Sequence, residues 1–224
     1  MTRQKNLIDS NVNILKNDIK KLTEMTVLQY ERIVQSIKEN DVKKALQVVK
    51  FDEEINSLAE DIDLETVVLI ARYQPVATDL RRIMTINKLA YEFERVADYA
   101  SNIAEYVITG KEMKVDNAVE IIANFEKKFR IIFEMIEMNV KAFLEEDKVL
   151  ARQAVMLDED LDRIYIDNFD DLLRKFKHSD DDDEQHMISR ALILNKHLER
   201  AGDHLTNVSE EILYLIKGKR YTLD

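Results

Sequence analysis

The chain has 224 residues, enough for one or two domains, and 46% of them are hydrophobic, enough for a sizeable core. With only three glycines and one proline, it lacks the turn formers that a β-sandwich or barrel needs, and its composition favours helix. The formal net charge of -11 argues against a nucleic-acid binder, which requires a basic face. We expect an all-α protein that meets cations or basic partner surfaces.

Apolar residues recur at helical spacing along almost the whole chain, and this periodicity predicts six long helices. In chain order they cover residues 5–39, 42–71, 75–109, 116–145, 148–177 and 182–217.

The expected helix ends coincide with residues that cap helices well. Pro75 is expected in the first turn of the third helix, where its missing N–H is harmless. Gly110 and Gly218 are placed to end the third and sixth helices in the left-handed conformation. The expected N-caps are Asp41, Asp116 and Asp147.

Three further features restrict the class of protein. No apolar run approaches the roughly 20 residues of a membrane span, and the N-terminal stretch lacks the apolar core of a signal peptide. The chain has no cysteine, which excludes disulfides and thiolate metal sites. It also shows no Gly-rich phosphate loop and no plausible Ser/His/Asp set. We therefore expect a soluble, cytoplasmic protein that is not an enzyme.

One helical motif occurs twice. ERVADYASNIAE at 94–105 and ERAGDHLTNVSE at 199–210 both read ERxxDxxxNxxE and lie 105 residues apart. Earlier helices form a second pair, because FDEEIN at 51–56 aligns with LDEDLD at 157–162. The chain is therefore predicted to be two tandem three-helix bundles related by an internal repeat. The predicted units are residues 1–111 and 112–224.

The acids of the repeated helix form one narrow stripe. At 100° per residue, Glu94, Asp98 and Glu105 fall within about 40° of one another. The apolar positions centre on the other side, so the stripe is expected on the outside or at the edge of its bundle. A single stripe of this kind is explained by the charged, solvent-facing side that any soluble helix carries. Like charges at i, i+4 are destabilising by about 0.2–0.5 kcal/mol per pair, so the recurrence of the arrangement favours a function.

The preceding helix of each unit adds polar residues at the same spacing, Asp158 with Asp162 and Asp52 with Asn56. If the two helices are neighbours, carboxylates converge on one groove, where a divalent or trivalent cation would relieve their repulsion. Such an all-oxygen site suits hard cations such as Mg, Mn, Ca or oxidised iron. The candidate ligands are Asp52, Glu94 and Asp98, here called the first acid cluster, and Asp158, Asp162, Glu199 and Asp203, the second acid cluster.

The histidines do not join these stripes. His197 and His204 lie on another face of their helix and are expected at solvent or at an interface. None of the four histidines follows a glutamate by three residues, which excludes the Glu-x-x-His pairs of a ferritin-like di-iron oxidase.

The segment ARYQPVATDLRRI at 71–83, together with YEFERVADYASNIAEY and HLERAGDHLTNVSEEILYLIKGK, resembles the PhoU family of phosphate-transport regulators. The resemblance covers essentially the whole chain. It implies a cytoplasmic, peripheral adaptor that restrains phosphate uptake and phosphate-starvation signalling. The implied partners are the ATPase of the ABC phosphate transporter and a sensor histidine kinase, and membrane contact would occur only through them.

The resemblance also implies a metal. Family members carry E(D)xxxD motifs that bind multinuclear iron or other metal clusters, and these motifs fall on the seven acids of the two clusters. Asn56 stands where the family usually has a second acid, so the first cluster should bind metal more weakly. Ala97 replaces a glycine that the second repeat keeps as Gly202.

Alternatives remain at three points. The chain could be a metal-binding or metal-buffering helical bundle that is not tied to phosphate signalling. The polar residues of the 71–83 segment could form either a capping network at a helix start or a partner-contact surface. The sequence leaves open whether the chain is a monomer or a homodimer.

Overall fold

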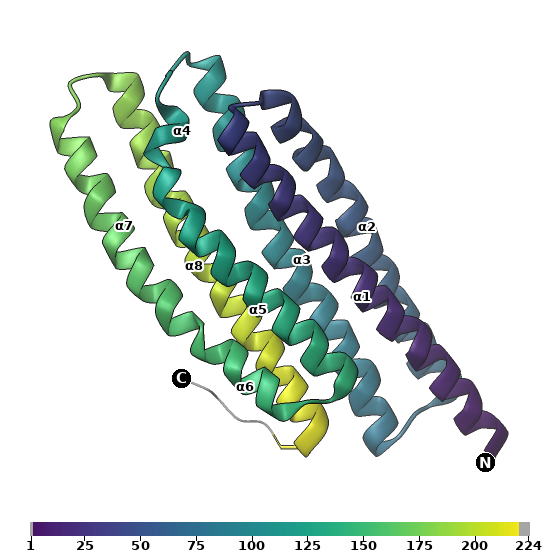
Figure 1. The fold of residues 1–224 in the computed structure, drawn as a ribbon. Coiled ribbons are helices and arrows are strands. Elements are labelled where there is room, and N and C mark those ends of the chain that lie inside the picture. Colours follow the sequence, from purple (N-terminus) through teal and green to yellow (C-terminus); the bar gives the residue numbers. More distant parts are fainter. Residues whose placement is uncertain (1, 220–224) are drawn as a thin grey trace.

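The structure, a computed structural model, describes residues 2–219; residue 1 and residues 220–224, which the predicted repeats include, lie outside the described part. Long antiparallel helices dominate the fold (Figure 1). The described part contains α1 (Thr2–Glu39), α2 (Val42–Tyr73), α3 (Ala77–Glu112), α4 (Ala118–Ile121), the 3-10 helix η1 (Ala123–Phe125), α5 (Glu126–Glu145), α6 (Lys148–Met156), α7 (Asp158–His178) and α8 (Asp182–Lys217). The expected all-α class is confirmed.

The helices form two three-helix units that lie side by side. In the first unit α1, α2 and α3 pack on one another, and in the second α5 and the α6–α7 pair pack on α8. The third helix of each unit, α3 and α8, joins the two units along much of its length (Figure 1). Buried apolar side chains from both units make up one continuous core. The predicted boundary between residues 111 and 112 falls in the last turn of α3.

Two of the six predicted helices are interrupted. The segment 116–145 is broken into α4, η1 and α5, and in this break the buried Tyr106 hydroxyl donates to the Ala118 carbonyl at 3.0 Å. The segment 148–177 is broken at Leu157, where α7 begins with three acids in its first turn. Acids at a helix N-terminus interact favourably with the helix dipole, which favours a new start at this point.

The predicted N-caps are right at two of three positions. The Asp41 carboxylate accepts from the Lys43 N–H at 2.9 Å, and that of Asp147 accepts from the Val149 N–H at 2.7 Å. The prediction for Asp116 is wrong, because Asn117 occupies the N-cap position of α4.

Of the two predicted glycine caps, the one at Gly218 is right and the one at Gly110 is wrong. Gly218 has φ 69 and ends α8, its N–H donating to the Tyr214 carbonyl at 2.8 Å. The prediction for Gly110 is wrong: α3 continues past it to Glu112. Gly110 is buried where a Cβ would lie 2.6 Å from the Cβ of Ala118, so its role is close packing.

The turn between α2 and α3 differs from the expectation for Pro75. Pro75 precedes α3 rather than standing in its first turn, since α3 begins at Ala77. Gln74, directly before the proline, has φ 45, and Ala77, two residues after it, has φ 46; both lie in the left-handed region that non-glycine residues rarely adopt. Pro75 disfavours the α conformation at the residue before it, so the helix stops there.

None of the helices in the described part of the chain combines the length and the apolar character that crossing a bilayer requires.

Candidate metal centre

The structure brings the second acid cluster together on two neighbouring helices. Asp158 and Asp162 lie in the first turns of α7, and Glu199 and Asp203 lie on α8, against which α7 packs. Asp158 is half-buried: its Oδ2 accepts from the Thr206 hydroxyl at 3.1 Å, and its buried Oδ1 has no hydrogen-bond partner among the described residues. Glu199 forms an ion pair with Lys196.

Burial dominates the electrostatics of this cluster. It raises the pKa of Asp158 to about 6, and the neighbouring acids, Asp203 first among them, push that pKa in the same direction. Burial, followed by the Glu199 charge, likewise raises the pKa of Asp203. Carboxylates whose charge is disfavoured in this way would be stabilised in their ionised form by a bound cation.

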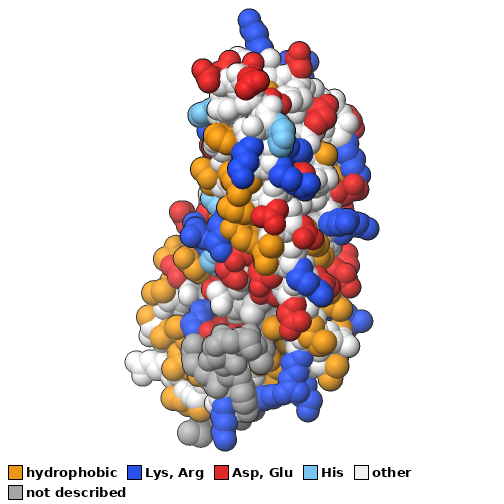
Figure 2. All heavy atoms as spheres, turned by 90° about the vertical axis from the view of Figure 1, so that its left-hand side faces the viewer, with side chains coloured by type: hydrophobic (Ala, Val, Ile, Leu, Met, Phe, Trp, Pro, Cys, Tyr) orange, Lys and Arg blue, Asp and Glu red, His pale blue; other side chains and the backbone are white. Residues whose placement is uncertain are grey.

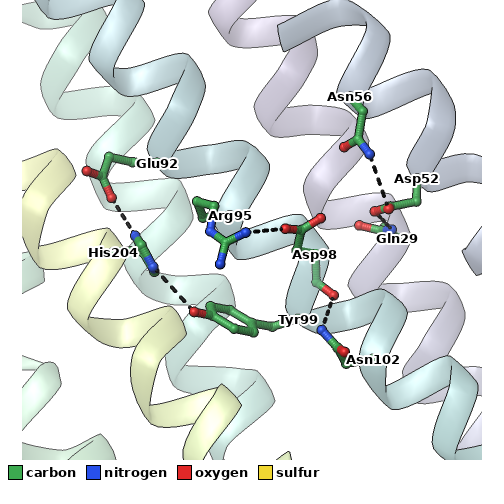
Figure 3. Close-up of polar contacts among 9 residues, drawn as sticks. All are labelled: Gln29, Asp52, Asn56, Glu92, Arg95, Asp98, Tyr99, Asn102 and His204. Carbon is green, nitrogen blue, oxygen red and sulfur yellow. Dashed lines mark hydrogen bonds and ion pairs between the residues drawn. The ribbon is translucent and has the colours of Figure 1, made fainter. Parts of the chain in front are cut away.

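The first acid cluster is also assembled, but amide groups and a guanidinium already satisfy much of it (Figure 3). Asp52 Oδ1 accepts from Gln29 Nε2 at 2.9 Å, and Asp52 Oδ2 accepts from Asn56 Nδ2 at 3.5 Å. Asp98 Oδ2 pairs with Arg95 Nη1 at 2.8 Å. Gln29 Nε2 also donates to Ser101 Oγ of α3 at 3.0 Å, so this amide ties α1, α2 and α3 together beside the acids.

Residual repulsion is still present in the first cluster. Burial raises the pKa of Glu94, and the charges of Asp98 and Asp52 add to this effect. Burial and the Asp52 charge also raise the pKa of Asp98. Glu94 and Asp98 of the predicted stripe are therefore half-buried beside α2, at the edge of their bundle, whereas Glu105 is exposed.

Within residues 2–219, no three acidic or histidine side chains are already arranged as a metal-coordination set. The structure thus shows the seven predicted acids gathered into two clusters, and metal binding by either cluster stays a prediction.

The sequence interpretation missed two buried polar residues near these clusters. Lys128 of α5 is fully buried, and its Nζ donates to the Asn195 carbonyl at 3.0 Å. Burial lowers the pKa of Lys128 to about 7, an effect that Glu199 and Asp162 partly oppose. Gln29 of α1 is fully buried against Asp52. Both occupy seam positions in otherwise apolar helical patterns, which is the signal that could have found them.

His197 and His204 of α8 lie at the junction between the two units, and Figure 3 shows the contacts of His204. His204 Nδ1 lies 2.6 Å from Glu92 Oε2 of α3, and its Nε2 lies 3.4 Å from the Tyr99 hydroxyl. The Tyr99 ring also lies against His197, with centroids 5.3 Å apart. Of the two expected locations, solvent or an interface, the structure thus places both rings at an interface.

The 71–83 segment combines a packing role with exposed residues. The Arg81 guanidinium lies 5.9 Å from the centroid of Tyr214, beside Gly218, so it supports the C-terminal end of α8. Val76, at the tip of the same turn, is 74% exposed. Arg81 therefore packs against α8 rather than capping α3, whose N-cap residue Val76 has no side-chain cap hydrogen bond. A partner-contact role for the segment stays a prediction.

Sequence comparison decides the family. The model of the PhoU domain matches residues 19–107 and again residues 125–212, one match in each three-helix unit. The chain is also 30% identical over 225 residues to the phosphate-specific transport system accessory protein PhoU homolog of Clostridium acetobutylicum, covering all of both chains. The chain belongs to the PhoU family.

Other PhoU proteins agree with this assignment. PhoU homolog 1 of Thermotoga maritima is 27% identical over 208 residues, which is 93% of this chain and 88% of that protein. The crystal structure of PhoU from Pseudomonas aeruginosa has a TM-score of 0.81 at 26% identity and covers 94% of this chain and 99% of that one. The phosphate transport system regulatory protein PhoU of Streptococcus pneumoniae gives 0.85 at 22% identity, covering 96% and 100%, which shows the shared fold.

In the chemistry of its donors, the second acid cluster fits the hard metal ion that PhoU membership suggests. Its donors are all carboxylate oxygens, and the buried Asp158 Oδ1 lacks a partner among the described residues. The first cluster fits less well, because both oxygens of Asp52 already accept hydrogen bonds. The residues that would hold the metal are Asp158, Asp162, Glu199 and Asp203.

Proposed function

We propose that this chain is a negative regulator of phosphate uptake and phosphate-starvation signalling, acting in the cytoplasm as an adaptor. The observation that carries the proposal is the match of both three-helix units to the PhoU domain, together with a full-length relative named as a phosphate-transport accessory protein. Its partners are the ATPase of the ABC phosphate transporter and a sensor histidine kinase. It reaches the membrane only through them and works by contact rather than catalysis.

The surface supports an adaptor that binds proteins. Figure 2 shows the α7 side of the molecule, where acidic and basic side chains alternate around a band of hydrophobic ones. Ile166 on α7 is 59% exposed, and Leu64 on α2 is 63% exposed. On the described part of the face in Figure 2, no broad basic patch suited to nucleic acid is visible. Contiguous exposed apolar side chains rimmed by polar and charged ones are typical of protein interfaces.

Deleting the gene tests the regulatory role. The proposal expects phosphate-starvation genes to be expressed even when phosphate is ample, because the transporter's state no longer reaches the kinase. Reporter expression in ample phosphate, with the wild-type gene restored as the control, measures this. Unchanged expression after deletion would rule the role out.

A tagged chain recovered from cells at high and at low phosphate tests the partners. The adaptor proposal expects the transporter ATPase and the kinase to be recovered, in amounts that depend on phosphate. Sedimentation of the purified chain shows whether a homodimer is the form that binds them.

We further propose that the second acid cluster holds a hard cation, an iron cluster or another divalent or trivalent metal, which would supply positive charge to these carboxylates. Supporting this are the unpartnered Asp158 oxygen and the raised pKa values of Asp158 and Asp203.

Paired substitutions test whether the second cluster binds metal more tightly than the first. Glu199→Gln with Asp203→Asn should remove more bound metal than Glu94→Gln with Asp98→Asn, because the first cluster is already satisfied by amides and Arg95. Metal analysis of the purified variants measures the difference. Equal losses would contradict the asymmetry.

Bound iron with turnover toward oxygen, and no effect of deletion on phosphate genes, would instead favour the metal-buffering alternative.

A further inference from the structure

Corresponding positions of the two repeats differ at one small residue beside the acids. The repeated helices align with an offset of 105, which pairs Ala97 of α3 with Gly202 of α8 and Ser101 with Thr206. The preceding helices pair Asp52 with Asp158. Both repeats therefore carry an acid, a small residue and a hydroxyl at corresponding positions, and the contacts of these three residues can be compared directly.

In the second repeat the missing Cβ of Gly202 provides the space in which Asp158 lies. A Cβ at position 202 would overlap with Asp158 Oδ1 and lie 2.5 Å from Leu161 Cδ2. Because this space is free, Asp158 reaches the surface of α8, and its Oδ2 accepts from the Thr206 hydroxyl at 3.1 Å. Its Oδ1 stays buried without a partner in the described chain.

In the first repeat the corresponding residue, Ala97, carries a Cβ and is fully buried. Asp52 does not bond Ser101 directly. The buried Gln29 amide lies between them instead, with Nε2 donating to Asp52 Oδ1 at 2.9 Å and to Ser101 Oγ at 3.0 Å. Asn56 holds the other Asp52 oxygen at 3.5 Å. The first acid is therefore satisfied by neutral amides, as Figure 3 shows.

We propose that Gly202 is the positioning residue that makes the second acid cluster a cation site, and that Ala97 with Gln29 closes the first cluster to cations. The glycine lets Asp158 dock on α8 with one oxygen fixed by Thr206 and the other left for a hard cation. The alanine holds Asp52 off α3, and the Gln29 amide takes the place that a cation would fill. The inference rests on the proposed metal function of the second cluster.

Titration of Mn²⁺ into the full chain, followed by calorimetry, tests this assignment. Gly202→Ala should weaken Mn²⁺ binding at least tenfold, because the added methyl displaces the Asp158 carboxylate. The matched control is Gly110→Ala, which also adds a crowded methyl to a long helix, in its last turn and at 2.6 Å from Ala118 Cβ, but lies away from both acid clusters. Its Mn²⁺ affinity should stay within twofold of the wild type. Gly202→Ala with wild-type affinity would overturn the proposal.

The reciprocal change opens the first cluster. Ala97→Gly combined with Gln29→Ala should add a second Mn²⁺ binding event, since it recreates the space beside Asp52 and removes the amide that fills it. An unchanged number of bound ions in a folded variant would count against the role of these two residues. This double variant still tests the proposal if Gly202→Ala does not fold.

A metal-free measurement separates this inference from the metal proposal itself. In urea unfolding with chelator present, Gly202→Ala should lower the folding equilibrium constant severalfold more in the wild type than in the Asp158→Ala background, where the overlap with the carboxylate is gone. Equal losses in the two backgrounds would show that Gly202 does not position Asp158. A wild-type chain that binds no Mn²⁺ but shows this coupling would overturn the metal function while supporting the positioning role.

Discussion

The Lys128 amino group is enclosed by the second three-helix unit and lies 5.1 Å from the centroid of the Tyr165 ring. Its one hydrogen bond within the described residues joins it to the Asn195 carbonyl. Enclosure disfavours the charged form, which is why the pKa of Lys128 falls to about 7, and the acids of the second cluster compensate only in part. A buried charge of this kind lowers stability at neutral pH unless nearby opposite charges and hydrogen bonds compensate for the lost hydration.

Lys128→Met is expected to raise the free energy of unfolding by about 1–3 kcal/mol at pH 7. The unfolded lysine holds its proton up to its ordinary pKa of 10.5, and the folded one only up to about 7. The wild type therefore gains stability as pH rises between these values, and the advantage of Met shrinks toward pH 10. Urea unfolding at pH 7 and pH 10 measures it, with the exposed Lys127→Met as control. No gain at pH 7 would contradict the burial argument.

Asp158→Asn tests a pKa shift in the opposite direction to that of Lys128. The folded pKa of Asp158 is raised from 3.8 to about 6, so the folded state favours the protonated form and loses stability as pH rises through this range. Asn removes that loss, and a gain of about 1 kcal/mol is expected at pH 8 after discounting for partial exposure. The gain should fade toward pH 4. Unfolding of this variant and of the exposed Glu159→Gln at pH 4 and 8 decides it.

At the scale of elements, the turn between α2 and α3 shows how helix ends are fixed by contacts as well as by residue type. The Gln74 N–H donates to the Ile70 carbonyl at 3.0 Å and closes α2, although Gln74 must adopt φ 45 to do so. Ala77 starts α3 at φ 46. An L-residue in this region costs about 1–2 kcal/mol, so the packing of both helices must hold the turn in place.

Ala77→Gly is accordingly expected to raise the free energy of unfolding by about 0.5–1 kcal/mol, since glycine adopts a positive φ without steric penalty. Ala71→Gly, an exposed position inside α2, should instead lower it by about 1 kcal/mol. Thermal unfolding of the two variants compares the same substitution in two backbone conformations. Destabilisation by both would mean that the turn is not strained.

At the scale of the whole molecule, the α3–α8 junction makes the two repeats one structure. Apolar residues of both units form a continuous core, and Tyr99 of α3 packs against both His197 and His204 of α8. A unit separated from its partner would expose this junction to water, which opposes independent unfolding.

The chain is therefore expected to unfold in one cooperative transition, despite its internal repeat. Far-UV circular dichroism and tyrosine fluorescence should give the same urea midpoint, because the eight tyrosines and the helices respond to the same event. Two separated transitions would show that the repeats are independent domains. In that case the predicted division near residue 111 would also mark a boundary of stability.

The site could be predicted from the sequence only in part. The seven acids and their division into two clusters follow from helical spacing, because i, i+4 positions share a face wherever the helix lies. Gln29 and Lys128 were missed, since a polar residue in an apolar seam can point into the core or past its edge. Whether such a residue meets an acid depends on how its helix is rotated against the next one, which local pattern does not encode.

The sequence by itself determined the helical class, the internal repeat and the acid stripes, because composition and periodicity act along a single chain. Tertiary structure decided which groups meet: Asp158 against the space left by Gly202, and Asp52 behind the Gln29 amide. These are contacts between segments far apart in sequence, and a shift of about one ångström between helices changes which of them form.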